Sequence, residues 1–195
     1  TDEGKPQLSG EQFGVYIGNM NSKFQLGWSN TFTYKDFSLY FLINGKIGGK
    51  VISFTEAELD KLGVSQRTAD ARLAAENNND LIWNGKPAMY MPDGNLAPIN
   101  AYYQGIGGDV NATQYVYDAT NFRLRELSLG YTFRNLLGAS KNVSLSLIAR
   151  NLFFIYKDAP VDPDISLSTQ NGLGAFEIFN MPSARSFGIS LKANF

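Results

Sequence analysis

Hydrophobic and polar residues alternate along five stretches of the chain, and this period of two is typical of strands that face two different environments. The longest stretch with this pattern reads FQLGWSNTFTY, with aromatic and aliphatic side chains on one parity and mostly small polar ones on the other. The alternation predicts antiparallel strands over residues 24–34, 37–54, 121–133, 142–154 and 185–195.

The connections between these strands alternate in length. Lys35 and Asp36 alone separate the first two strands, which predicts a tight hairpin, and residues 134–141 form a modest turn. Residues 55–120 and 155–184 are long connections. Bacterial barrels have short periplasmic turns and long extracellular loops. We therefore expect the two long connections to be extracellular and the C-terminus to be periplasmic.

The first long connection loses the alternation. Thr55 to Glu58 match a capping box before a short helix that ends near Gly63, and Ser65 is placed to cap a second helix. The rest of this connection contains clusters of Asn, Pro and Gly that are typical of irregular loop. The sequence thus predicts an all-β chain, the C-terminal strands of a transmembrane β-barrel, with a short helical insertion in an extracellular loop.

The composition excludes several classes of function. The 195 residues include no Cys and no His, which removes thiol nucleophiles, disulfides, imidazole bases and the commonest zinc sites. Lys and Arg number 17 against 18 Asp and Glu, so we expect no nucleic-acid partner. No apolar run is long enough for a helical membrane span, and we expect no signal peptide at the N-terminus. We expect neither enzymatic activity nor a cofactor or metal.

Five strands are fewer than the roughly eight of the smallest bacterial barrels, so we expect this chain to be a fragment of a larger one. An alternative is a soluble β-sandwich whose apolar faces pack on each other and whose loops bind carbohydrate. A third hypothesis is a glycan-active enzyme that uses paired acids such as Glu56 and Glu58. Those acids fit better at the N-terminal end of a helix, where its dipole favours negative charge.

Two groups of loop residues are candidates for binding. Aromatic side chains could stack on sugar rings or pack on peptide side chains, although packing within the loop or on a partner lipoprotein is the alternative. Carboxylates in the second long connection could bind calcium, but they lack the EF-hand glycine and glutamate, and a solvated loop is favoured. The aromatic candidates are Trp83, Tyr90, Tyr102 and Tyr103, and the acidic ones are Asp158, Asp162 and Asp164.

Four segments, in the same order, resemble the SusC/RagA family of TonB-dependent outer-membrane transporters. IGNMNSKFQLGWSNTFTYKDFSLYFLINGKIGGKV is similar to the family's GN-x-N segment followed by an aromatic hairpin, and NFRLRELSLGYTF and ARNLFF resemble two of its strands. LGVSQRTADAR is similar to a segment of its large loop. Met20 departs from the family, where proline is common, and the final Asn-Phe follows the family ending only loosely.

The resemblance implies a 22-stranded barrel whose plug and link to the TonB complex lie outside this sequence. It also implies a SusD-like surface lipoprotein as partner, and oligosaccharides or oligopeptides as substrates imported through the outer membrane. An alternating C-terminal strand that ends in Phe is the type of signal read by the barrel-assembly machinery. The residues that match it are Phe187, Ile189, Leu191 and Phe195.

Overall fold

The computed structural model describes residues 15–78, 80–91, 94–108, 112–135, 142–165, 167–168 and 173–194. The chain forms two compact units, each assembled from separate stretches of sequence. The sheet unit comprises Asn19–Lys50, Asp118–Ile165 and Met181–Phe195. The insert unit comprises Thr1–Gly18, Val51–Tyr117 and Ser166–Asn180, so most of its described residues come from the two long connections.

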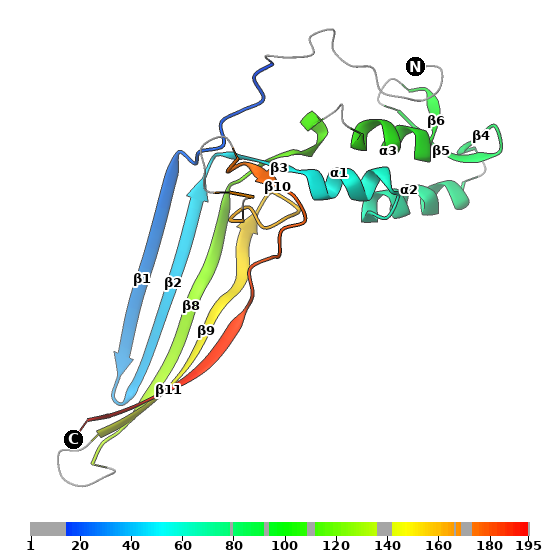
Figure 1. The fold of residues 1–195 in the computed structure, drawn as a ribbon. Coiled ribbons are helices and arrows are strands. Elements are labelled where there is room, and N and C mark those ends of the chain that lie inside the picture. The colour runs from blue at the N-terminus through cyan, green and yellow to red at the C-terminus, as the bar shows by residue number, and fades with distance from the viewer. Residues whose placement is uncertain are drawn as a thin grey trace. The chain divides into compact units, whose positions relative to one another are not determined.

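The sheet unit contains one five-stranded antiparallel sheet in which the strands lie in chain order (Figure 1). The antiparallel, mainly β fold expected from the alternation is therefore confirmed. Each outer strand, β1 and β11, has a single partner strand among the described residues. The five strands are β1 (Phe24–Tyr34), β2 (Phe37–Ile47), β8 (Asn121–Phe133), β9 (Asn142–Lys157) and β11 (Ser186–Asn194).

The predicted strand over residues 37–54 is divided in the structure. Gly48 and Gly49 have φ angles of 76° and 91°, a left-handed conformation that ends β2. The following β3 (Lys50–Ser53) belongs to a separate three-stranded sheet with β7 (Val116–Asp118) and β10 (Phe176–Glu177). The pairing of β10 with β3 is parallel. The glycine pair thus marks the end of the long strand rather than a bulge within it.

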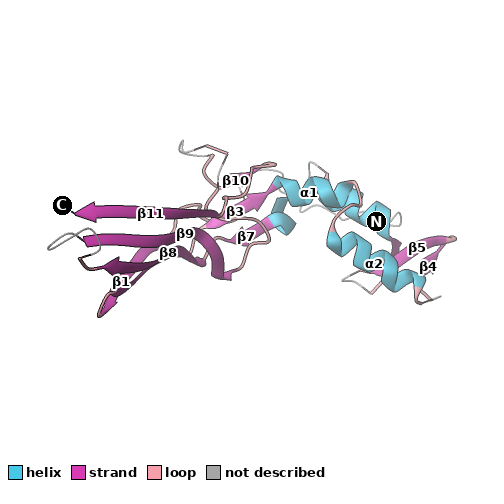
Figure 2. Cartoon of the chain, turned by 90° about the horizontal axis from the view of Figure 1, so that it is seen from below, coloured by secondary structure: helices cyan, strands magenta, loops and turns pink. Residues whose placement is uncertain are grey.

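The insert unit holds more regular structure than the sequence indicated (Figure 2). Its described residues form three helices, a 3-10 turn and a small antiparallel sheet, with a core of Ala75, Ile99, Tyr103, Ile106 and Tyr115. None of the helices in the described part of the chain is long and apolar enough to cross a membrane. The elements are α1 (Phe54–Lys61), α2 (Gln66–Glu76), β4 (Ile82–Trp83), β5 (Lys86–Tyr90), β6 (Leu96–Pro98), α3 (Ile99–Gly107) and η1 (Ala112–Tyr115).

The sequence predicted the N-terminal cap of α2 but not that of α1. Ser65 caps α2 as predicted, and its hydroxyl accepts a hydrogen bond from the Thr68 backbone N–H at 3.2 Å. The predicted cap at Thr55 is wrong, because α1 begins earlier and Ser53 accepts from the Glu56 N–H at 3.2 Å. Thr55 instead donates to Glu177, at 2.8 Å. Thr55, which the local sequence pattern assigned to the cap, therefore binds a side chain of the second long connection instead.

Glu177 joins the two long connections within the insert unit. Its carboxylate accepts hydrogen bonds from the hydroxyls of Ser53 at 2.7 Å and Thr55 at 2.8 Å, and from the Asn180 N–H at 3.3 Å. Glu177 itself is buried. A buried carboxylate needs such donors to offset its desolvation. These bonds connect residues far apart in sequence to one side chain, and they position α1 relative to β10.

Gly107 permits close contact between α3 and α1. A Cβ atom at this position would contact the Ala57 carbonyl oxygen and would lie 2.9 Å from the Lys61 backbone nitrogen. Both neighbours are helix backbone and cannot rotate away. We expect Gly107→Ala to destabilise the insert unit by about 1–3 kcal/mol, the usual cost of overpacking.

Hydrogen exchange of the backbone amides of α1 and α3 in the full-length protein would measure this loss. Gln104→Ala, at an exposed position of the same helix, is the control and should leave exchange nearly unchanged. Equal protection in wild type and Gly107→Ala would show that the two helices do not depend on this contact.

Candidate functional site

One face of the five-stranded sheet is apolar and accessible. The register aligns rows of side chains across all five strands, because residues paired on neighbouring strands lie on the same face. In the middle row each member is at least 37% exposed, and Ile189 is 74% exposed. That row contains Phe32, Leu39, Leu129, Leu147 and Ile189.

An aromatic cluster lies on this face near the short turns. Phe37 and Tyr131 have ring centroids 4.7 Å apart, and Tyr131 and Phe133 are also 4.7 Å apart, both edge-on. Tyr34 is 71% exposed beside Phe37. At the same end, Arg134 pairs with Asp36 at 2.5 Å, which connects the strand end of β8 to the β1–β2 turn. A broad apolar face with an aromatic border therefore runs across the sheet.

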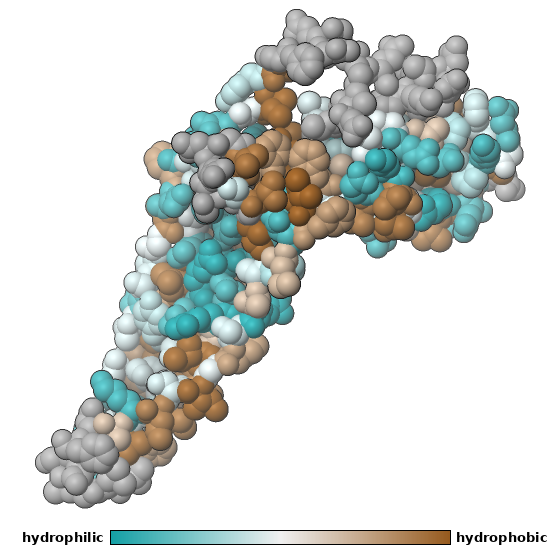
Figure 3. All heavy atoms as spheres, in the orientation of Figure 1, coloured by the Kyte–Doolittle hydropathy of each residue, from teal (hydrophilic) through white to brown (hydrophobic). Residues whose placement is uncertain are grey.

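The opposite face carries mainly small or polar side chains. One of its rows contains Thr33, Ser38, Gly130, Ser146 and Ser190. Thr132 and Ser144, one row further, share a hydrogen bond at 3.0 Å. Figure 3 shows hydrophilic residues gathered on the upper part of the sheet unit and hydrophobic ones on its lower part in that view. The two faces of the sheet therefore differ in polarity.

A β-bulge determines which face Arg123 occupies. The β2–β8 register places Leu42 opposite Glu126 but Ile43 opposite Leu124, so Arg125 is an extra residue in β8. Strict alternation from Leu127 would place Arg123 on the apolar face. With the bulge, Arg123 pairs with Asn44 on the polar face. The sequence alone did not identify this change of face.

Arg123 and Arg125 hold the loop that follows β9. Arg123 is only 3% exposed, and its Nη2 lies 2.5 Å from Asp162 Oδ2. Arg125 contacts Asp164 at 2.6 Å, and Lys46 of β2 reaches the other oxygen of Asp164 at 2.9 Å. The Arg123 guanidinium also lies over the Phe154 ring, 3.8 Å from its centroid. The cluster fixes the loop to the polar face.

The aspartates of this loop are engaged rather than solvated. Burial alone would raise the pKa of Asp162, but hydrogen bonds from Ser183 at 2.6 Å and from Arg123 outweigh burial and lower the pKa below its usual value. The solvated loop favoured from sequence is therefore wrong for Asp162 and Asp164. Within the described ranges, no group of three or more acidic side chains is arranged to hold a metal.

A polar hollow of about 260 Å³ lies beside this cluster. Its lining includes Gln25, Asn44, Lys46, Arg125 and Asp164, which all belong to the sheet unit. Charged and amide groups around a hollow of this size can hydrogen-bond polar solutes or water. The polar face is therefore built to contact hydrated material.

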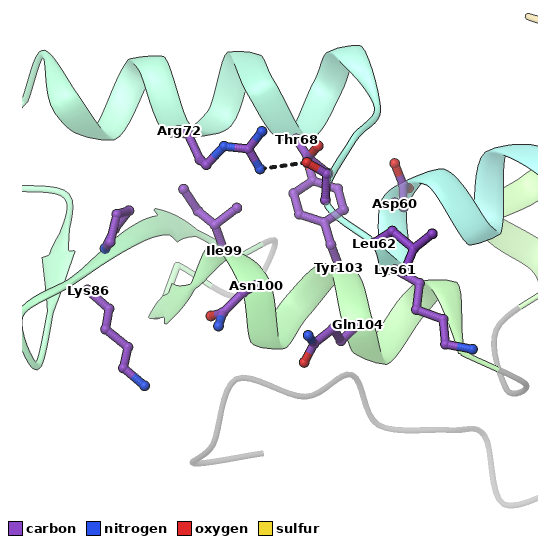
Figure 4. Close-up of a pocket in the computed structure, with 12 residues that line it drawn as sticks. Asp60, Lys61, Leu62, Thr68, Arg72, Lys86, Ile99, Asn100, Tyr103 and Gln104 are labelled. Atoms are coloured by element: carbon purple, nitrogen blue, oxygen red, sulfur yellow. Dashed lines mark hydrogen bonds between the residues drawn. The ribbon is translucent and has the colours of Figure 1, made fainter.

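The insert unit has a larger cavity, of about 310 Å³, between α1, α2, α3 and β5 (Figure 4). Leu62, Ile99 and Tyr103 provide apolar surface, while Lys61, Arg72 and Lys86 contribute cationic groups. Asp60 borders it but is fully buried, accepting from Arg67 Nε at 2.9 Å and from the Tyr115 hydroxyl at 2.8 Å. Burial and the Asp60 hydrogen bond both raise the pKa of Tyr115, which keeps its hydroxyl protonated as a donor.

The four candidate aromatic residues occupy different environments. Tyr103 is only 7% exposed in the core, although it lines the cavity, and half-buried Tyr102 packs edge-on against it at 5.3 Å. Trp83 pairs with Lys86 across the tight β4–β5 turn, and Tyr90 is 60% exposed at the end of β5. The structure thus brings Tyr102 and Tyr103 together, and only Tyr103 of the four lines the cavity.

Three of the four residues of the expected assembly signal lie on β11. Phe187, Ile189 and Leu191 are each at least 70% exposed and share the apolar face with Ala149, Leu147 and Leu145 of β9. Phe195 lies outside the described residues.

Some residues of these sites were not singled out from the sequence. Arg123 depends on the bulge, and no local signal locates a bulge in an alternating strand. Lys86 follows Asn84 and Gly85, a dipeptide typical of tight hairpins that would have located the β4–β5 turn. Arg72 and Lys61 become neighbours of one cavity only through the packing of the helices.

Comparison with known proteins places these features in a larger architecture. No protein-family model matches the chain. The chain is 24% identical over 187 residues to TonB-dependent receptor P3 of Formosa agariphila, an alignment that covers 92% of this chain and 17% of that protein. Its fold matches part of the RagAB peptide importer, solved in a closed-closed state, with a TM-score of 0.57 and 18% identity over 96% of this chain.

The chain spans only 17% of the curated relative and 19% of the matched RagAB chain. Both matches extend over nearly the whole of this chain, across both units. The printed names of the two matches refer to a receptor and to a peptide importer. In sequence the chain is therefore similar to a part of a TonB-dependent receptor, and in fold it is similar to a part of the RagAB peptide importer.

Proposed function

We propose that this chain forms part of the wall and loops of an outer-membrane receptor that imports nutrients with energy supplied through TonB. The accessible apolar face of the five-stranded sheet supports this proposal most directly. In a bilayer each strand must pair its backbone groups within a closed sheet, and only the outward side chains meet hydrocarbon. The apolar face would contact lipid and the polar face would line the lumen.

The order of the connections supports an orientation for the strands. The β1–β2 and β8–β9 turns are at one end, and both connections that build the insert unit leave from the other. In barrels of this type the short turns are periplasmic. The insert unit would then be extracellular and the C-terminus periplasmic, and β11 with Phe187, Ile189, Leu191 and Phe195 would present the signal for the barrel-assembly machinery.

The proposed substrates are oligosaccharides or oligopeptides, received together with a SusD-like surface lipoprotein. The RagAB match is a peptide importer, which favours peptides, while the loop aromatics Trp83, Tyr90, Tyr102 and Tyr103 would suit either class. Strands outside this chain would complete the barrel. The plug and the contact with TonB would also lie outside this chain. No catalytic role is assigned to the chain.

The alternative, a soluble carbohydrate-binding β-sandwich, requires a second sheet over the apolar face. The middle row of that face is 37–74% exposed in the structure, and the sheet unit contains no second sheet in its described residues. A sandwich core would be far less accessible. The exposure of the apolar face therefore favours the outer-membrane interpretation.

An arginine on each face of one strand tests the proposal. Leu129→Arg would place a charge on the apolar face and Ser128→Arg a matched charge on the polar face. We expect Leu129→Arg to cost about 2–4 kcal/mol if the residue lies near the bilayer midplane, whereas a charge facing the lumen is tolerated. Ser128→Arg is therefore the control.

Both variants would be made in the full-length protein and extracted from membranes. The fraction of protein in the outer membrane, and the shift in gel mobility on boiling, report folded barrel. Loss of folded barrel for Leu129→Arg alone supports the proposal. A detergent-free soluble protein, or equal tolerance of both substitutions, contradicts it.

A further inference from the structure

The cavity of the insert unit combines an apolar interior with unneutralised positive charge. Leu62, Ile99 and Tyr103 line its interior, and the surface it exposes is mainly apolar. Its volume of about 310 Å³ is near the lower limit for small-molecule sites, enough for one ring or side chain with its attachments. An apolar cavity alone would accept any hydrophobic group, so the charges determine its selectivity.

The cationic groups of the cavity have few competing partners. Among the described residues, the one ion pair of Lys61 is an exposed contact with Glu58 at 3.4 Å, which contributes little. Arg72 donates one hydrogen bond to the Gly63 carbonyl at 2.8 Å, and its guanidinium has five N–H donors in all. Across the described part of the chain, neither Arg72 nor Lys86 forms an ion pair. Their positive charges remain available to a ligand.

The one acidic residue at the cavity does not cancel these charges. Asp60 is fully buried, and Arg67 and Tyr115 already occupy its two oxygens. Asn100 and Gln104 lie four residues apart on α3, so their amides share one face of the helix. In Figure 4 these amides stand between Lys86 and Lys61. Cations and neutral hydrogen-bonding groups therefore surround the cavity.

We infer that this cavity binds an organic anion with a compact ring or apolar body, whose acidic group is held by Lys61 or by Lys86, while Arg72 adds a third positive charge to the lining. Such an anion could be a peptide, through its carboxylate, or an acidic oligosaccharide. Trp83, opposite Lys86 in the β4–β5 hairpin, is positioned near the end of the cavity that Lys86 borders. The binding of the anion does not depend on the proposed function. The inference rests on the proposed function only in that the receptor would import the bound ligand.

Isothermal titration of the full-length receptor in detergent tests this inference. One pair of probes is a tetrapeptide containing one phenylalanine, with either a free or an amidated C-terminus. The second pair is trigalacturonate and its methyl ester. We expect one charged probe to bind roughly tenfold more tightly than its neutral counterpart, the effect of one charge-assisted contact. The pair that shows the difference identifies the source of the anion.

The variant Lys61→Gln with Lys86→Gln removes two exposed charges and no described ion pair except the weak one with Glu58. We expect it to reduce the preference for the charged probe, with Arg72 as the cation that remains at the cavity. Lys35→Gln, in the β1–β2 turn of the sheet unit, is the control for the loss of a lysine charge away from the cavity and should preserve the preference. The gel mobility shift on boiling verifies that all variants are folded.

Equal binding of charged and neutral probes, or a preference that the double substitution leaves unchanged, would overturn the inference. Binding is measured on purified protein. A receptor that folds in the membrane but shows no charge preference refutes the anion site alone, whereas failure of the arginine test on β8 refutes the membrane function.

Discussion

Replacing Arg123 with methionine is expected to release the loop that follows β9 from the polar face of the sheet. The substitution keeps much of the side-chain volume but leaves Asp162 with only Ser183 and the Asp164 N–H as donors. Removing one partner of a buried ion pair costs about 3–5 kcal/mol, because the remaining charge stays desolvated. Both the Arg123 and Asp162 side chains are less than 10% exposed, so solvent screening offsets little of this cost.

Hydrogen exchange of residues 158–165 in the full-length protein would measure the release, as a loss of protection of two orders of magnitude or more. Arg150→Met is the matched control. Arg150 pairs with Glu126 at 3.0 Å but its side chain is 59% exposed, so the loss should remain below about 1 kcal/mol. If Arg123→Met and Arg150→Met behaved alike, the loop would not depend on the buried pair.

Acid should reproduce the effect of Arg123→Met in the wild-type protein. The folded-state pKa of Asp162 is lowered from its usual 3.8, so its contribution is complete above that value and is lost as the pH falls through the folded-state pKa. We expect loop protection to be constant at higher pH and to decline below about 3.8. Asp162→Asn should remove this part of the pH dependence.

Replacing Asp60 with alanine is expected to destabilise the insert unit by about 3 kcal/mol. The change leaves the Tyr115 hydroxyl, 2% exposed, without its acceptor, and it removes the carboxylate paired with Arg67. The Arg67 side chain is 37% exposed and can turn toward water, which places the cost at the low end of the range for a buried pair. The core around Tyr103 and Tyr115 should loosen as a unit.

Amide exchange of α1, α2 and α3 in the full-length protein would report this change, as a fall in protection of roughly a hundredfold. Asp70→Ala on α2 is the control. Asp70 accepts one exposed hydrogen bond from Gln66 at 2.8 Å. Its substitution should therefore lower the free energy of unfolding by less than about 0.5 kcal/mol. Unchanged protection in Asp60→Ala would show that the buried acid does not organise the core.

Alternation was sufficient to locate the five long strands of the sheet unit. β1 and β8 have the bounds that the pattern indicated, and the two-residue turn at Lys35 and Asp36 joins β1 to β2. These features are encoded locally, because the side-chain period of a strand is two and each parity faces one environment. The family resemblance likewise rests on short runs of residues, and the relatives found by comparison agree with it.

The helical insert was predicted less well. Ser65 was recognisable as a cap because its partner lies three residues away. The sequence did not predict the cap of α1, because Thr55 hydrogen-bonds Glu177, which is far away in the sequence. It also did not predict the helix α3, whose Gly107 packs closely against α1. Tyr103 appeared equivalent to the other loop aromatics, but packing buries it in the core.

The sequence by itself determined which residues form strands and that one face of each strand would be apolar, since both follow from the order of neighbouring residues. The tertiary structure alone decided that Arg123 faces Asp162 and that Lys61, Arg72 and Lys86 border one cavity. A bulge adds one residue and reverses the faces beyond it, and helix packing joins residues distant in sequence. Such contacts depend on where whole elements pack, which no local pattern encodes.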